Sequence, residues 1–250
     1  FVWYRMALRL RHLFLGMNFH YLYISRKAVF VSCLYDLSDY ELELVFSDTI
    51  GYTPRQLLSS LALEADEMLQ AFCADELDEP LDSGKRVRFY DRIRSSSLAK
   101  ILLEKSGEAR RLLLSYLRQE GFLGSEKPGI VDIGWKGNTN RVLNYILRRE
   151  EDTNAYLSFF LGVKETRHPI ASIGDYEAGY YFEDYLDEPE YAYNLFALVY
   201  VLENYFSASD DTTLSRYREE DGTIYPEFSP GIISDASKEK NQYILRLTEG

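Results

Sequence analysis

The sequence has few residues that form covalent or metal cross-links: two cysteines and three histidines in 250 residues. Cys33 and Cys73 form no CxxC pair, and no histidine stands at metal-ligand spacing from another; the three are His12, His20 and His168. A disulfide framework and a structural zinc site are therefore not expected. The chain also lacks GxSxG and HExxH sequences, so hydrolase triads and zinc-protease chemistry have no support.

Long hydrophobic runs are missing as well. The longest apolar stretch, if polar atoms such as those of Asn194 are tolerated, is Tyr193 to Leu202, about half of the roughly 20 residues that a membrane-spanning helix needs. The apolar start of the chain is interrupted by arginines, in a basic amphipathic helix pattern over residues 3–17, and has no cleavage site of a signal peptide. We therefore expect a cytoplasmic protein without a membrane span. The first residue is not Met, so an N-terminal truncation is also expected.

Basic residues are fewer than acidic ones, 28 against 40, which gives a formal net charge of -12. This balance argues against a general nucleic-acid partner, because such binding depends on neutralising phosphates. The charges alternate in blocks. Residues 1–35 and 83–149 are basic, whereas residues 36–82 and 150–250 are acidic. A protein of this kind can still present a basic edge to a phosphate.

The hydrophobic pattern predicts an α/β protein. Short apolar runs bounded by turns predict strands, and apolar residues at helical spacing predict helices. The order strand, glycine turn, helix, strand over residues 129–162 indicates a right-handed parallel βαβ unit. The expected strands cover residues 20–25, 129–133, 155–162 and 179–182; the expected helices include 139–149 and 189–206; a hairpin is expected around Asp221-Gly222.

The expected fold class is a three-layer, Rossmann-like domain with a mainly parallel sheet. The whole chain, residues 1–250, is interpreted as one domain. A helical insertion is expected over about residues 36–121, with a helix that starts at Thr53-Pro54 and a break near Ser95 to Ser97. A C-terminal extension over about residues 207–250 would carry the hairpin.

The sharpest local feature is the segment Ile130-Val131-Asp132-Ile133-Gly134-Trp135-Lys136-Gly137-Asn138-Thr139. Asp132 is expected near the carboxyl end of a buried strand. Two glycines would let the chain turn tightly, and Asn138 or Thr139 would cap the following helix. Free amides at such a helix start favour phosphate, and Lys136 would add a positive charge. A tight turn that serves packing alone remains the alternative.

A second anion-binding segment, Ser25-Arg26-Lys27, follows the expected strand at residues 20–25. If this strand and the strand at 129–133 are parallel neighbours, Ser25 to Lys27 and the Gly134 to Thr139 turn meet at one edge of the sheet. Two cations, a hydroxyl group and a set of amides would then surround one anion. The alternative is that Arg26 and Lys27 are ordinary surface cations.

Four segments together resemble a known family: Tyr21 to Ala28 (YLYISRKA), Leu114 to Gly121 (LSYLRQEG), Val131 to Gly137 (VDIGWKG) and Glu203 to Ala208 (ENYFSA). In this order they are similar to the region that follows the phosphatase-like domain in bacterial predicted hydrolases of the haloacid dehalogenase superfamily. The resemblance covers roughly residues 18–228. It implies an association with surface-polysaccharide biosynthesis and with glycosyltransferases.

The chain departs from that family at the nucleophile. A phosphatase of this superfamily needs a strand-borne Asp-x-Asp motif, and this chain has Asp132-Ile133-Gly134. Phosphatase activity is therefore not implied, and whether the chain is an enzyme stays open. A weaker likeness in layout, to type I phosphoribosyltransferases, supports phosphate binding but not that reaction.

The sequence thus predicts a phosphate-recognising domain that binds a sugar phosphate or a nucleotide-sugar. The expected substrate-binding residues are Ser25, Arg26, Lys27, Gly134, Lys136, Gly137, Asn138 and Thr139. If the domain is catalytic, Asp132 is the expected acid/base or the ligand of a divalent cation such as Mg²⁺, with Arg26 and Lys136 stabilising phosphate charge. The alternatives are a non-catalytic scaffold that accompanies glycosyltransferases and a phosphoribosyltransferase-like enzyme.

Overall fold

The fold is seen in a computed structural model of the chain. The structure describes residues 2–46, 51–135, 137–150, 156–164, 178–184 and 212–230, together with residues 239, 242, 243 and 246. Within these ranges the protein mixes helices and strands, with a small parallel sheet and an antiparallel hairpin. The α/β character expected from the sequence is therefore present.

The N-terminal part consists of short helices joined by an extended segment. It contains α1 (Val2–Arg9), the 3₁₀ helix η1 (Arg11–Leu13) and α2 (Arg26–Val31). The side chain of Ser25 begins α2, since its hydroxyl oxygen accepts a 3.1 Å hydrogen bond from the Ala28 amide. The basic helix expected over residues 3–17 is thus divided into α1 and η1.

The prediction of a strand at residues 20–25 is wrong. These residues are extended, but none of them belongs to a sheet in the described part of the chain. The Tyr23 amide donates to the Tyr116 hydroxyl at 3.0 Å, and the Tyr23 carbonyl accepts from the Tyr217 hydroxyl at 2.6 Å. Two tyrosine hydroxyls thus satisfy the peptide groups that a neighbouring strand would otherwise bond.

Six helices follow: α3 (Asp39–Phe46), α4 (Pro54–Ser60), α5 (Ala65–Met68), α6 (Ala74–Leu77), α7 (Ser83–Ser95) and α8 (Leu98–Gln119). Thr53 and Gln56 form the capping box that starts α4, with Pro54 at the first helical position. At the break between α7 and α8, the Ser96 hydroxyl oxygen accepts a hydrogen bond from the Leu98 amide. Both helix boundaries agree with the sequence prediction.

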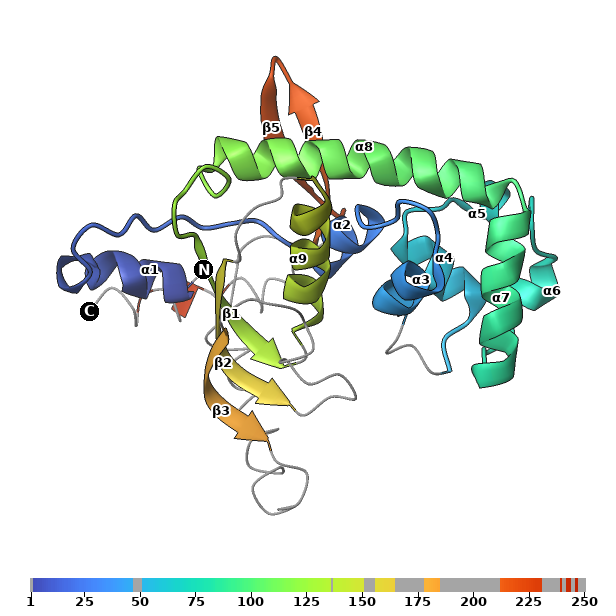
Figure 1. Cartoon of the computed structure of the whole chain (residues 1–250), viewed down its shortest axis with the longest axis horizontal. Helices are drawn as coiled ribbons and strands as arrows, with labels where there is room; N and C mark the ends of the chain where they lie inside the picture. Colours follow the sequence, from blue (N-terminus) through green and yellow to red (C-terminus); the bar gives the residue numbers. More distant parts are fainter. Residues whose placement is uncertain are drawn as a thin grey trace.

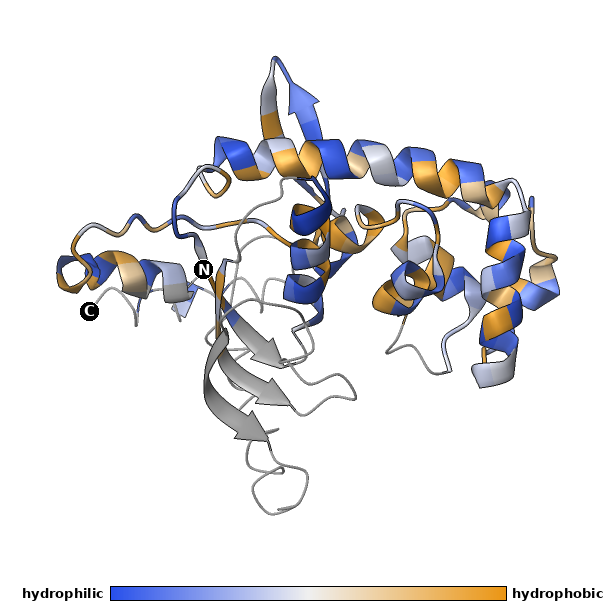
Figure 2. Cartoon of the chain, in the orientation of Figure 1, coloured by the Kyte–Doolittle hydropathy of each residue, from blue (hydrophilic) through white to orange (hydrophobic). Residues whose placement is uncertain are grey.

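The longest of these helices, α8, runs along one side of the molecule (Figure 1). Helices α3 to α7 lie by its N-terminal half, and the hairpin of β4 (Leu214–Glu220) and β5 (Thr223–Phe228) crosses its other half. Polar and apolar residues alternate along α8 (Figure 2). In the described parts of the chain, no helix combines the length and the apolar character that a membrane crossing requires.

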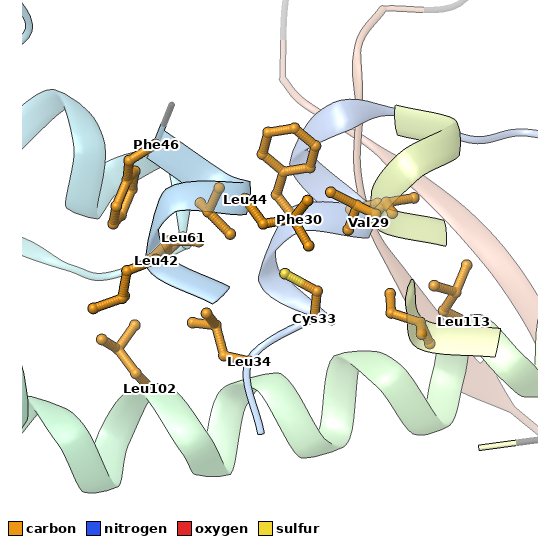
Figure 3. Close-up of a cluster of buried hydrophobic side chains, with 14 of the residues drawn as sticks. Val29, Phe30, Cys33, Leu34, Leu42, Leu44, Phe46, Leu61, Leu102 and Leu113 are labelled. Atoms are coloured by element: carbon orange, nitrogen blue, oxygen red, sulfur yellow. The ribbon is translucent and has the colours of Figure 1, made fainter. Parts of the chain in front are cut away.

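The hydrophobic core lies between α8 and the helices packed on it. Leu34, Leu42 and Leu102 belong to this core, and Figure 3 shows them near one another, with Cys33 and Phe30 above them in the view. All five side chains are buried. This core fixes α2 and α3 against α8, and α9 (Asn138–Glu150) packs on α2 and α3 in turn.

The parallel sheet has the strand order β1-β2-β3, formed by β1 (Gly129–Trp135), β2 (Leu157–Lys164) and β3 (Ala178–Asp184). Helix α9 connects β1 to β2, which confirms the expected parallel βαβ unit. The register places Asp132 beside Phe160 and Val131 beside Phe159. Because side chains alternate along a strand, Asp132 and Phe160 face α9 while Val131 and Phe159 face the other way.

The hairpin at β4 and β5 is antiparallel, as the Asp221-Gly222 pair predicts. Both turn residues have positive φ, 50° at Asp221 and 75° at Gly222, which a two-residue hairpin turn needs. The expected helix at residues 189–206 lies outside the described residues.

Candidate functional site

Six of the nine residues selected from the sequence fall between positions 132 and 139, where β1 leads into α9. The carbonyl of Gly137 accepts the first helical hydrogen bond, from the Arg141 amide at 2.9 Å, so Gly137 is the N-cap of α9. Its φ of +62° lies in the left-handed region, which glycine adopts without strain. Asn138 and Thr139 were expected as caps, but they form the first turn of the helix instead.

Gly137, the N-cap residue of α9, has no side chain. Serine or aspartate at this position would offer an oxygen to the first amides of the helix. The positive end of the helix dipole lies at this start of α9, and it favours an anion placed there.

Asp132 lies in the middle of β1, not near its end, because the strand runs two residues past the expected boundary to Trp135. Its carboxylate oxygen Oδ2 accepts a 3.0 Å hydrogen bond from the Asn140 side-chain amide. Asp132 is half-buried and Asn140 is only 3% exposed. The first turn of α9 thus holds the carboxylate of the strand in one orientation.

Asn140 is itself fixed from the neighbouring strand. The Tyr156 hydroxyl donates to the Asn140 carbonyl at 2.9 Å, and the Ser158 hydroxyl donates to the Asn140 side-chain oxygen Oδ1 at 3.4 Å. Tyr156 and Ser158 are both buried. A buried polar cluster therefore joins β1, α9 and β2 directly below the turn, and such a cluster restricts the side chains to one arrangement.

The sequence analysis missed Asn140, Tyr156 and Ser158. A signal for Asn140 was present, because Asn140 and Asn144 lie four residues apart on the same face of α9 as Leu143 and Leu147. A polar residue on the apolar face of a helix needs a buried partner. Tyr156 and Ser158 gave no local signal, since only strand pairing brings them to α9.

A second buried polar cluster positions α9 from its other end. Glu41 is fully buried, and its Oε2 accepts hydrogen bonds from the amides of Tyr35, Asp36 and Leu37 at 2.9–3.1 Å. Its Oε1 accepts a 2.8 Å bond from the Tyr145 hydroxyl of α9. A buried carboxylate is tolerated only with such a set of donors. Glu41 therefore ties the α2–α3 loop to α9 and helps to fix the helix that carries Asn140.

Ser25, Arg26 and Lys27 lie at the start of a helix and not at the end of a strand. β1 pairs with β2, and residues 20–25 are not in the sheet, so the expected parallel pairing that was to bring the two segments together is wrong. The Ser25 hydroxyl donates to the Leu214 carbonyl at 2.8 Å, besides capping α2. Its hydrogen bonds therefore hold the helix and the hairpin.

Gly134 and Lys136 were also expected at the site. Gly134 lies in β1 and pairs with Gly162 of β2, so its backbone is part of the sheet ladder. Lys136 lies outside the described residues. The structure thus brings together Asp132, Gly137, Asn138 and Thr139 at one strand-to-helix turn.

A divalent cation was considered as a partner of Asp132. Within the described ranges, no group of three or more His, Cys, Asp or Glu side chains is arranged to hold a metal ion. The oxygen that Asp132 turns toward α9 already accepts the Asn140 amide. These residues do not supply the carboxylate-rich oxygen set that Mg²⁺ prefers, and no chemical step is derived through a metal.

The arrangement can recognise two kinds of ligand group. The positive end of the α9 dipole favours an anion, whereas the Asp132 carboxylate can only accept, from a hydroxyl or an amine. A molecule that carries a phosphate next to hydroxyl groups would satisfy both. Comparison of the chain with models of known protein families finds no match, and comparison with curated proteins finds none either.

Proposed function

We propose that the β1–α9 turn binds the phosphate of a sugar phosphate or a nucleotide-sugar. The observation that carries the proposal is the 3.0 Å bond from the Asn140 amide to Asp132, next to a helix whose N-cap is glycine. It supports a rigid acceptor beside the positive end of the α9 dipole. In open parallel sheets, ligands bind at the edge where strands lead into helices.

The proposal includes a finer fold assignment, a three-layer Rossmann-like domain in which this turn lies at the ligand-binding edge. The parallel order β1-β2-β3 and the crossover through α9 are consistent with it. The sugar part of the ligand, the place in surface-polysaccharide biosynthesis and the association with glycosyltransferases rest on the sequence resemblance. The proposal keeps the cytoplasmic location expected from the sequence.

Asp132 has a defined role in this proposal: its carboxylate accepts a hydrogen bond from a hydroxyl of the sugar. The same group is the acid/base residue if the bound molecule reacts. The buried cluster behind it supports positioning, because Asn140, Tyr156 and Ser158 fix the carboxylate before any ligand arrives. Binding without reaction, as in a scaffold module, would use the same contacts.

A thermal-shift screen tests the proposal with inorganic phosphate, glucose 1-phosphate, free glucose and a nucleotide-sugar. Ligand binding to the folded state alone raises the melting temperature. We expect the sugar phosphate and the nucleotide-sugar to stabilise the protein, and Asp132→Ala and Lys136→Ala to weaken that stabilisation. Asp91→Ala removes an exposed carboxylate on α7 and serves as the control. A wild-type protein that none of the phosphorylated ligands stabilises would refute the proposal.

A further inference from the structure

The N-terminal tip of the molecule exposes an unusual amount of apolar surface. Of the large hydrophobic side chains that are exposed in the described residues, six lie between positions 8 and 17. Leu15 is 90% exposed, Leu13 64% and Met17 63%. The others are Leu8, Leu10 and Phe14. Large apolar side chains that are exposed together in one short segment indicate an interaction site.

Positive charge accompanies this apolar surface. Residues 1–35 contain five Arg or Lys residues and no Asp or Glu, whereas the whole chain has a net charge of -12. Arg9 and Arg11 are exposed and stand between the apolar residues. Polar and apolar residues lie side by side in α1 and η1 (Figure 2). The tip, defined as residues 5–17, is therefore both basic and apolar.

Aromatic contacts join α1 and the tip to the extended segment that follows them. The Tyr4 and Tyr21 rings lie 5.9 Å apart, and the Phe14 and Phe19 rings meet edge to face at 5.7 Å. Tyr21 in turn contacts Tyr23, whose peptide group is bonded to Tyr116 and Tyr217. The exposed side chains thus belong to an anchored structure. Figure 1 shows α1 at one end of the molecule, far from α3 to α7.

We propose that the tip binds the surface of an anionic phospholipid bilayer. The apolar side chains would enter the boundary between headgroups and acyl chains, while Arg9 and Arg11 would lie against lipid phosphates. The charge pattern selects this partner. A symmetric contact between two copies would bring two basic tips together, whereas an anionic surface attracts the tip and repels the acidic remainder, which orients the molecule.

This inference goes beyond the proposed ligand site and does not depend on it, because the tip and the β1–α9 turn share no residue. Membrane association would be peripheral. It would require the tip alone.

Flotation of the 250-residue chain with lipid vesicles tests the inference. The vesicles are phosphatidylcholine alone, or phosphatidylcholine with about one third phosphatidylglycerol. We expect binding to the anionic vesicles only, and weaker binding at high salt. Arg9→Gln should lower the partition coefficient about fivefold, the effect of losing ~1 kcal/mol per cation. The double substitution Leu13→Ser and Leu15→Ser should lower it by about tenfold or more.

Matched controls lie on α7, where Val87 is 61% exposed and Arg88 is also exposed. Val87→Ser and Arg88→Gln should leave vesicle binding unchanged. Absence of binding to anionic vesicles would overturn the inference, as would equal binding to both vesicle types. A dimer in light scattering that the Leu13/Leu15 variant dissociates, without vesicle binding, would also overturn it and assign the tip to self-association.

Discussion

The side-chain amide of Asn140, in the first turn of α9, donates a 3.0 Å hydrogen bond to the carboxylate of Asp132 on β1. This contact connects the strand to the helix across a glycine turn. It places the one carboxylate selected from the sequence beside the start of α9. The proposed function depends on this geometry.

Asn140→Ala is expected to lower the free energy of unfolding by about 1–3 kcal/mol, because it removes one hydrogen-bond donor of the half-buried Asp132 carboxylate and the acceptor of the buried Ser158 hydroxyl. Urea denaturation measures the change. Asn18→Ala, at an exposed position, is the control and should change stability by less than about 0.5 kcal/mol. Equal effects of the two substitutions would contradict the buried cluster.

Gly137→Ala should destabilise the protein by about 1–2 kcal/mol, because a side chain at φ +62° is strained. Gly107→Ala provides the opposite case. Gly107 lies inside α8, and no atom lies within 4 Å of an added Cβ, so alanine should stabilise by about 0.5–1 kcal/mol. Thermal unfolding of both variants measures the two changes in stability, which should have opposite signs. Two changes of the same sign would contradict the turn geometry at Gly137.

High pH should destabilise the junction between α8 and the hairpin. Burial raises the pKa of Tyr116 to about 12, from the ordinary tyrosine value of about 10. Burial also raises the pKa of Tyr217, whose ring stacks on Tyr116 with centroids 4.8 Å apart. Because the folded-state pKa is raised, this stabilisation is complete below about pH 10 and is lost as the pH rises toward 12.

Chemical unfolding across this pH range, together with tyrosinate absorbance, measures the loss. Tyr116→Phe should reduce the slope of stability against pH, and it should also lower stability at neutral pH because the Tyr23 amide loses its acceptor. An unchanged alkaline slope in this variant would contradict the assignment.

The two cysteines should differ in reactivity. Burial raises the pKa of the Cys33 thiol well above its ordinary range, and Cys33 is fully buried, whereas Cys73 is exposed. The thiolate is the reactive form, so a thiol reagent at mildly alkaline pH should modify one cysteine quickly. Cys73→Ser should abolish that fast phase, and Cys33 should react only in denaturant. Two fast thiols in the native protein would contradict the position of Cys33 in the core.

Local patterns in the sequence predicted the βαβ unit and the hairpin. Thr53-Pro54 started a helix, Asp221-Gly222 formed the hairpin turn, and the apolar face of residues 139–149 predicted α9. These features depend on short-range chemistry, in which turn residues and hydrophobic periodicity act within a few positions. The sequence was therefore sufficient to predict the βαβ unit, the hairpin and the start of α4.

Long-range contacts could not be predicted in the same way. The run from His20 to Ser25 has the composition of a strand, but the hydroxyls of Tyr116 and Tyr217, both distant in the chain, bond its peptide groups. The prediction that Arg26 and Gly134 contribute to one anion site depended on that strand. It is wrong because residues 20–25 do not belong to the sheet. The partner of Asp132 was missed for a related reason, because Asn140 is fixed by residues of a later strand.

The most direct measurement is the chemical-shift change of backbone amides in an NMR titration with glucose 1-phosphate, using free glucose as the control. We expect the largest changes at the amides of residues 137–140, a saturating curve, and a loss of the response in Asp132→Ala with the fold retained. Free glucose should leave these amides unchanged. No response at residues 137–140, or a response centred on Arg26 and Lys27, would contradict the β1–α9 turn as the phosphate site.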